Sequence, residues 1–178
     1  MIRMVIVDDH ALFREGLASI IQIEPDIEVS GLAGTVQEAM ETVRELKPDI
    51  VLMDFTLPDG TGADATRLVL REHPDCKIIF LTMSDEDENL FAAIRSGAKG
   101  YLLKNMSPSK LVTTIRSVQR GESALSRSMT LRLMEELSRT KGSERLEDQW
   151  LEKLTQREKD VLRVLTTGKT NKEIANHL

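Results

Sequence analysis

Short apolar runs alternate with amphipathic segments through the first 120 residues of the chain. Each run has the length of a buried strand, and each following segment repeats apolar residues every three or four positions, which is typical of one helix face. Strict alternation of strands and helices indicates a parallel sheet with helices on both faces, a doubly wound α/β fold. Five strands are predicted, at Met4–Val7, Ile27–Ala33, Ile50–Met53, Lys77–Leu81 and Gly100–Leu103. Their order within the sheet does not follow from periodicity.

The segments after these strands predict five helices. The fifth opens with Ser107 and Pro108, an N-cap residue followed by proline at the first helical position. The pattern changes after Gly121. Residues 127–138 predict a separate amphipathic helix, whereas the polar residues 140–149 predict a flexible linker.

The last 28 residues predict two short helices, at 155–167 and 170–178, and each begins with a capping box. A tight turn containing Gly168 separates them, which is the layout of a helix-turn-helix. We therefore expect three parts. Residues 1–120 form the α/β domain, residues 121–150 form a linker with an amphipathic helix, and residues 151–178 form an incomplete all-α helix-turn-helix segment.

Charge is distributed unevenly along the chain, whose net charge is −5. Residues 1–120 carry 13 Lys and Arg against 19 Asp and Glu, so any DNA contact is expected from the later part. The single cysteine, Cys76, excludes an internal disulfide and a cysteine-based metal site. No apolar run approaches the roughly 18 residues of a membrane span, and the N-terminus lacks a signal-peptide layout. We expect a cytoplasmic protein with no membrane contact.

Polar side chains follow four of the five predicted strands. Asp8 and Asp9 follow the first strand, Asp54 the third, Thr82 the fourth and Lys104 the fifth. The carboxyl ends of parallel strands open into one crevice, where three carboxylates would repel one another unless a cation neutralised them. Oxygen ligands of this kind suit Mg²⁺, and a carboxylate beside Mg²⁺ can take up a phosphoryl group. An ammonium and a hydroxyl would then stabilise the charge on the phosphoryl oxygens.

These residues lie in motifs that resemble those of a response-regulator receiver domain. The motifs are Val-Asp-Asp-His at 7–10, Leu-Met-Asp at 52–54, Leu-Pro-Asp-Gly-Thr-Gly at 57–62, Leu-Thr at 81–82 and Gly-Tyr-Leu-Leu-Lys at 100–104. Leu-Thr-Gln-Arg-Glu at 154–158 and Asn-Lys-Glu-Ile-Ala at 171–175 resemble the start of a LuxR-type helix-turn-helix. Together the two parts resemble the NarL/FixJ class of two-component response regulators, over nearly the whole chain.

The resemblance implies a flavodoxin-like receiver that is phosphorylated in a Mg²⁺-dependent manner and controls transcription. It implies the following roles: Asp54 as phosphoacceptor, Asp9 and Asp54 as direct Mg²⁺ ligands, Asp8 as a ligand through water, the carbonyl of Thr56 as a further ligand, Lys104 as a phosphate contact, and Thr82 with Tyr101 as the switch pair. The implied phosphodonor is a sensor histidine kinase, and phosphorylation is expected to produce a homodimer. Phosphate on Asp54 would draw the Thr82 hydroxyl toward it and let Tyr101 turn inward.

The recognition helix of the family should follow Leu178. We therefore expect promoter DNA to be bound by the full-length parent and not by this chain, which then contains no DNA-binding residues of its own. His10 is interpreted as flanking a helix rather than as a metal ligand, because no second His or Cys lies nearby.

Two other functions fit parts of the pattern. A Mg²⁺-dependent phosphatase with an aspartyl-phosphate intermediate would usually carry a second Asp two residues after the nucleophile, where this chain has Thr56. Loss of that proton donor favours a long-lived acyl phosphate and hence a switch, with at most slow self-dephosphorylation. A flavodoxin-like flavin carrier would need a phosphate-binding loop after the first strand, and Asp8 and Asp9 would repel that phosphate.

Overall fold

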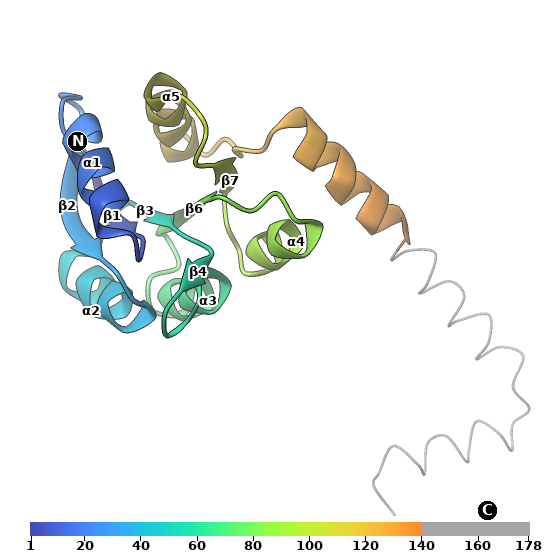
Figure 1. The fold of residues 1–178 in the computed structure, drawn as a ribbon, viewed down its shortest axis with the longest axis horizontal. Helices are drawn as coiled ribbons and strands as arrows, with labels where there is room; N and C mark the ends of the chain where they lie inside the picture. Colours follow the sequence, from blue (N-terminus) through green and yellow to red (C-terminus); the bar gives the residue numbers. More distant parts are fainter. Residues whose placement is uncertain (140–178) are drawn as a thin grey trace, which may run out of the picture. The chain divides into compact units, whose positions relative to one another are not determined.

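The computed structural model describes residues 1–139, of which residues 1–131 form one compact unit. Its centre is a five-stranded parallel sheet with the strand order β2-β1-β3-β6-β7 (Figure 1). The strands are β1 (Ile2–Val7), β2 (Ile27–Ala33), β3 (Ile50–Met53), β6 (Lys77–Thr82) and β7 (Gly100–Leu103). A small antiparallel hairpin, β4 (Thr56–Leu57) with β5 (Gly60–Thr61), follows β3. The predicted five-stranded parallel sheet is confirmed.

Two strands are longer than the sequence pattern predicts. β1 begins at Ile2, and β6 includes Thr82, which pairs with Leu103 of β7. The backbone of Thr82 is therefore held in the sheet and not in the loop that follows. A β-branched residue fits this extended position well, although its polar side chain suggested a strand end.

Five helices cover the sheet, as predicted. They are α1 (Ala11–Ile21), α2 (Val36–Leu46), α3 (Gly62–Glu72), α4 (Asp87–Arg95) and α5 (Pro108–Gln119). Figure 1 shows α1 and α5 on one face of the sheet and α2, α3 and α4 on the other. Thr35 and Thr61 cap α2 and α3 through side-chain hydrogen bonds. Ser107 occupies the N-cap position of α5 and Pro108 begins the helix, as predicted, although the Ser107 side chain makes no capping hydrogen bond.

Burial on both faces explains why the strands are continuous apolar runs. Met4 and Ile6 of β1 face the core cluster under α1 and α5, together with Leu52 of β3 and Leu81 of β6. The intervening residue Val5 is equally buried. Each fully buried side chain of this size contributes roughly 1.5–3 kcal/mol, so the strands are fixed strongly and their carboxyl ends are held in register.

The chain after α5 returns to the outer edge of the sheet. The backbone N–H of Ala124 donates to the Lys99 carbonyl at 2.9 Å, and the Tyr101 N–H donates to the Ala124 carbonyl at 2.9 Å. A side chain at Gly100 would meet the Ala124 Cβ at 2.9 Å, so glycine permits this close approach. The sequence pattern did not predict this pairing, which covers the exposed edge of β7.

The helix predicted at 127–138 is present at residues 127–139. The linker predicted at 140–149 and the two helices predicted at 155–167 and 170–178 lie outside the described residues. Within residues 1–139, none of the helices combines the length and the apolar character that a membrane span requires.

Candidate functional site

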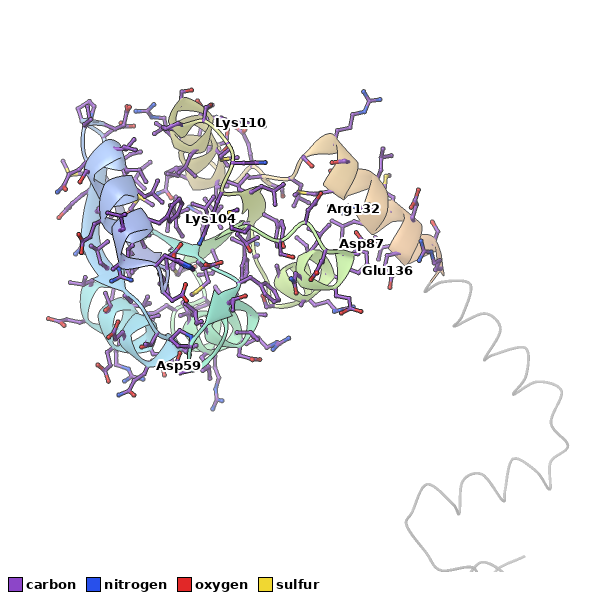
Figure 2. The ribbon with its side chains drawn as sticks, in the orientation of Figure 1. Asp59, Asp87, Lys104, Lys110, Arg132 and Glu136 are labelled. Atoms are coloured by element: carbon purple, nitrogen blue, oxygen red, sulfur yellow. The ribbon has the colours of Figure 1, made fainter. Side chains whose placement is uncertain are left out.

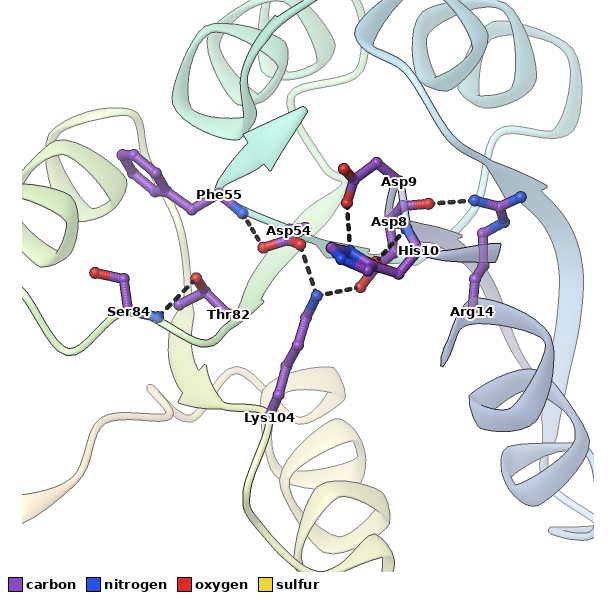
Figure 3. Close-up of polar contacts among 9 residues, drawn as sticks. All are labelled: Asp8, Asp9, His10, Arg14, Asp54, Phe55, Thr82, Ser84 and Lys104. Atoms are coloured by element: carbon purple, nitrogen blue, oxygen red, sulfur yellow. Dashed lines mark hydrogen bonds and ion pairs between the residues drawn. The ribbon is translucent and has the colours of Figure 1, made fainter. Parts of the chain in front are cut away.

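The carboxyl ends of β1, β3 and β7 bring two carboxylates and one ammonium together (Figure 3). Asp8 follows β1, Asp54 follows β3 and Lys104 follows β7. The Lys104 Nζ lies 2.6 Å from the Asp8 Oδ2 and 2.6 Å from the Asp54 Oδ2. All three were predicted at one edge of the sheet, and the structure brings them into direct contact.

Burial makes this ion cluster electrostatically strong. The exposed fractions are 2% for Asp8 and 6% for Asp54, and the Lys104 side chain is 6% exposed. Burial raises the pKa of the Asp54 carboxyl, and the nearby charge of Asp8 adds to this rise, although Lys104 opposes it. Burial also works to lower the pKa of Lys104, but its hydrogen bonds to Asp54 and Asp8 outweigh burial and raise that pKa. Lys104 therefore places a positive charge between two buried carboxylates.

The backbone around Asp54 aims its carboxylate into the crevice. The Asp54 Oδ1 accepts a hydrogen bond from the Phe55 N–H at 2.6 Å, and the Asp54 N–H donates to the Val7 carbonyl at 2.8 Å. Gly62, the first residue of α3, lies directly behind. A Cβ at this position would come within 2.0 Å of the Asp54 carbonyl oxygen. Glycine at position 62 is thus required for the close approach of α3 to the strand end.

Asp9 completes an oxygen-rich corner of the site. Asp8, Asp9, His10 and Asp54 each offer one ligand atom, and these atoms lie within 4.8 Å of one another. Carboxylates that converge in this way are the donor set that Mg²⁺ prefers, so the residues fit the predicted metal. The His10 Nδ1 lies 2.7 Å from the Asp9 Oδ1. His10 also precedes α1 as its N-cap residue, without a side-chain cap, which agrees with its interpretation as a flanking residue.

Thr82 and Tyr101 contact the same loop residue from two sides. The Thr82 Oγ1 accepts a hydrogen bond from the Ser84 N–H at 3.2 Å (Figure 3). The Tyr101 hydroxyl donates to the Ser84 carbonyl oxygen at 2.9 Å. Tyr101 has no exposed surface, so its side chain points into the protein. The Tyr101 ring stacks beside Phe80, with 6.1 Å between the ring centroids, and its predicted role in a switch with Thr82 stays a prediction.

Several contacts of the site were not predicted. Arg14 of α1 donates to the Asp8 carbonyl oxygen, and Ser84 connects the two proposed switch residues. A serine two residues after Thr82 is a recognisable turn former, so this spacing was a usable signal. Thr56 starts β4 two residues after Asp54, with an exposed side chain. The role of its carbonyl in metal binding stays a prediction.

Two family models match the sequence. Residues 4–116 match the response regulator receiver domain, and residues 152–178 match the bacterial regulatory proteins of the luxR family. The first match covers more than half of the chain. The protein therefore belongs to the two-component response regulators of the NarL/FixJ class, which combine a receiver domain with a LuxR-type DNA-binding region.

Individual relatives extend this assignment. The chain is 37% identical to the oxygen regulatory protein NreC of Staphylococcus carnosus, over 99% of this chain and 82% of that protein. It is 38% identical to the transcriptional regulatory protein LiaR of Bacillus subtilis, over 100% of this chain and 82% of that protein. A LuxR-family response regulator from Aurantimonas sp. SI85-9A1 has a similar crystal structure, with a TM-score of 0.71, 34% identity and coverage of 78% of this chain and 99% of that one.

These similarities identify the function at the level of the class. The protein is a phosphorylated regulator of transcription rather than a classical enzyme, and the phosphatase alternative is not favoured. The receiver domain implies a histidine kinase as phosphodonor, and the LuxR-type region implies DNA binding.

Proposed function

We propose that Asp54 is the carboxylate that takes up the phosphoryl group. One Asp54 oxygen attacks the phosphorus of a kinase phosphohistidine or of a small acyl phosphate. The bond between phosphorus and the leaving atom breaks as the new phosphorus–oxygen bond forms, and the leaving atom keeps the electron pair. The acceptor must be charged and directed into the crevice, and the Phe55 N–H holds one Asp54 oxygen in this orientation.

Mg²⁺ would be held by Asp9 and Asp54 directly, by the carbonyl of Thr56, and by Asp8 through water. When bound, the ion neutralises charge on the phosphoryl oxygens and on the crowded carboxylates. Asp9 is the most accessible of the three carboxylates, with a side chain that is 35% exposed, whereas Asp8 and Asp54 are buried. An entering ion would therefore meet Asp9 first.

The observation that carries this proposal is the ammonium shared between two buried carboxylates. Lys104 contacts Asp54 at 2.6 Å, so a short movement would transfer its hydrogen bond from the Asp54 oxygen to an oxygen of a phosphoryl group attached there. Asp8, at an equal distance, would keep the Lys104 ammonium in place during that exchange. A preorganised cation of this kind stabilises charge where it develops, without the cost of reorganising solvent.

The switch proposal centres on Ser84. A phosphoryl group on Asp54 would attract the Thr82 hydroxyl, which now accepts a hydrogen bond from the Ser84 N–H. Losing this acceptor would release the loop before α4, while the Tyr101 hydroxyl still holds the Ser84 carbonyl. We infer that the change in this loop, together with an inward position of Tyr101, alters the face that favours a homodimer. A typical coupling of about 1–3 kcal/mol would be enough to shift that equilibrium.

Intact-mass measurement tests the acceptor. The chain is incubated with Mg²⁺ and acetyl phosphate, and one phosphoryl group is expected on the wild type and none on Asp54→Asn. Asp9→Ala or removal of Mg²⁺ with a chelator should slow the labelling strongly. Equal labelling of Asp54→Asn would refute the acceptor, and labelling that survives the chelator would refute the metal requirement.

Light scattering with beryllium fluoride as a phosphate mimic tests the homodimer. The mimic should increase the mass of the wild type and leave Thr82→Ala largely unchanged, because that variant lacks the hydroxyl that responds to phosphate. The same mass for the wild type with and without the mimic would refute the dimer.

The proposed setting of this switch is the cytoplasm, where the histidine of a sensor kinase would be phosphorylated.

A further inference from the structure

Lys104 has a third partner besides Asp8 and Asp54. The Lys104 Nζ lies 4.7 Å from the centroid of the Phe13 ring, on the face of the ring. This distance is within the roughly 6 Å over which an ammonium is attracted to the negative face of an aromatic ring. We propose that Phe13 is a positioning residue for phosphoryl transfer, which it supports by holding the Lys104 ammonium over its ring. This inference rests on the proposed function of Asp54 and Lys104.

The surroundings of Lys104 explain why the ring matters. An apolar groove of about 310 Å³ runs between α1 and α5, and both Phe13 and Lys104 line it. Its other lining residues include Leu17, Leu81 and Leu111, which are aliphatic. Aliphatic atoms offer an ammonium no electrostatic attraction, whereas the ring face does. Phe13 is thus the aromatic partner that this groove offers the Lys104 ammonium.

Burial strengthens this contact. The Lys104 side chain is 6% exposed, so water competes little for its ammonium. Phe13 is half-buried and packs against the core cluster under α1 and α5, which fixes the ring plane. A cation over an aromatic ring is worth more in such a desolvated position than at an exposed one. A fixed ring therefore restricts where the ammonium of a flexible four-carbon side chain can lie.

The contact has a consequence for the reaction. While a phosphoryl group is being attached to Asp54, Lys104 exchanges an Asp54 oxygen for a phosphoryl oxygen. During the exchange only Asp8 and the Phe13 ring hold the ammonium. Without the ring, the side chain can withdraw toward Asp8 or into the groove, and small displacements of a charged group have large effects on rate. The expected result is a lower maximal rate and weaker binding of a phosphate mimic.

Stepwise fluorination of Phe13 separates this role from packing. Fluorine withdraws electrons from the ring face and weakens its attraction for a cation, while the shape of the ring changes little. 4-Fluorophenylalanine and 3,4,5-trifluorophenylalanine are placed at position 13 of the full chain. Labelling of Asp54 by acetyl phosphate with Mg²⁺ is followed by intact mass over a range of donor concentrations, and beryllofluoride affinity is measured in parallel.

We expect the maximal rate and the beryllofluoride affinity to fall in steps, to about fivefold below wild type for the trifluoro ring. Phe13→Leu should show the same loss of maximal rate and of beryllofluoride affinity as the trifluoro chain. Phe13→Trp should retain most of the maximal rate. Leu12→Ala, which alters an exposed residue of the same groove, is the matched control and should behave as wild type. A spectroscopic readout needs no phosphate: the ring-current shift of the Lys104 ε protons should disappear in Phe13→Leu.

Wild-type rates in both fluorinated chains, with losses only in Phe13→Leu, would reduce Phe13 to a packing residue and overturn the proposal. An unshifted Lys104 ε signal in the wild type would also overturn it. Failure of the proposed function looks different, because the wild-type chain itself would then take up no phosphoryl group on Asp54.

Discussion

Replacing Lys104 with methionine should destabilise the receiver more than any surface charge substitution. Lys104→Met keeps the length and the apolar stem of the side chain but removes the ammonium that contacts both Asp8 and Asp54 at 2.6 Å. Two carboxylates with exposed fractions of 2% and 6% would then face each other without a countercharge. Leaving a buried charge without its partner typically costs about 3–5 kcal/mol, which lowers the Tm of a domain of this size by roughly 6–20 °C.

The loss of folding stability in Lys104→Met depends on pH, and the structure determines the direction of this dependence. Burial already raises the pKa of the Asp54 carboxyl above its ordinary value, and Lys104 is the main influence that lowers it. Without Lys104 the pKa of Asp54 in the folded state rises further. Over a wider range of pH, the folded state then binds more protons than the unfolded state. Stability then falls as pH rises through that range. The difference between variant and wild type should be small near pH 4 and largest near pH 8.

Thermal and urea unfolding from pH 4 to pH 8 measures this difference. Lys110→Met is the matched control, because Lys110 is an exposed lysine on α5 and its loss should change stability little (Figure 2). Millimolar Mg²⁺ should narrow the gap at pH 8, since a divalent cation can replace the missing ammonium. A destabilisation below about 1 kcal/mol, or one equally large at pH 4 and pH 8, would refute the electrostatic account of the site.

Three further results are expected from the same geometry. Mg²⁺ should raise the Tm of the wild type by mass action, and should raise the Tm of Asp9→Asn much less, which calorimetry at constant pH would measure. An equal rise in Tm for both proteins would show that Asp9 is not a metal ligand. Tyr101→Phe should cost about 1 kcal/mol in urea unfolding, because the partly buried Ser84 carbonyl loses its donor, and a neutral result would mean that another donor replaces it. Gly62→Ala should lose several kcal/mol and slow Asp54 labelling, because its Cβ would lie 2.0 Å from a backbone oxygen; normal stability and labelling would show that α3 shifts freely.

The elements of the fold could be predicted because their signals are local. The apolar run Ile50–Met53 indicates a strand, and the Asp54 that follows indicates where this strand ends. The observed β3 has these bounds. The meeting of Asp8, Asp54 and Lys104 also followed from the sequence, because parallel strands in a doubly wound sheet all end at the same edge. The family motifs contain the same residues, which explains why resemblance and physical reasoning agreed.

Tertiary structure alone decided the contacts that depend on long-range pairing. The strand order, the pairing of Ala124 with β7 and the depth of Tyr101 all join segments whose spacing carries no periodic signal. The position of the Lys104 ammonium was likewise undetermined, because a flexible side chain finds its place only among its neighbours. The sequence thus determined which chemical groups reach the site, and packing decided which of them touch: the free energies of such contacts depend on burial and distance, which exist only once the chain has folded.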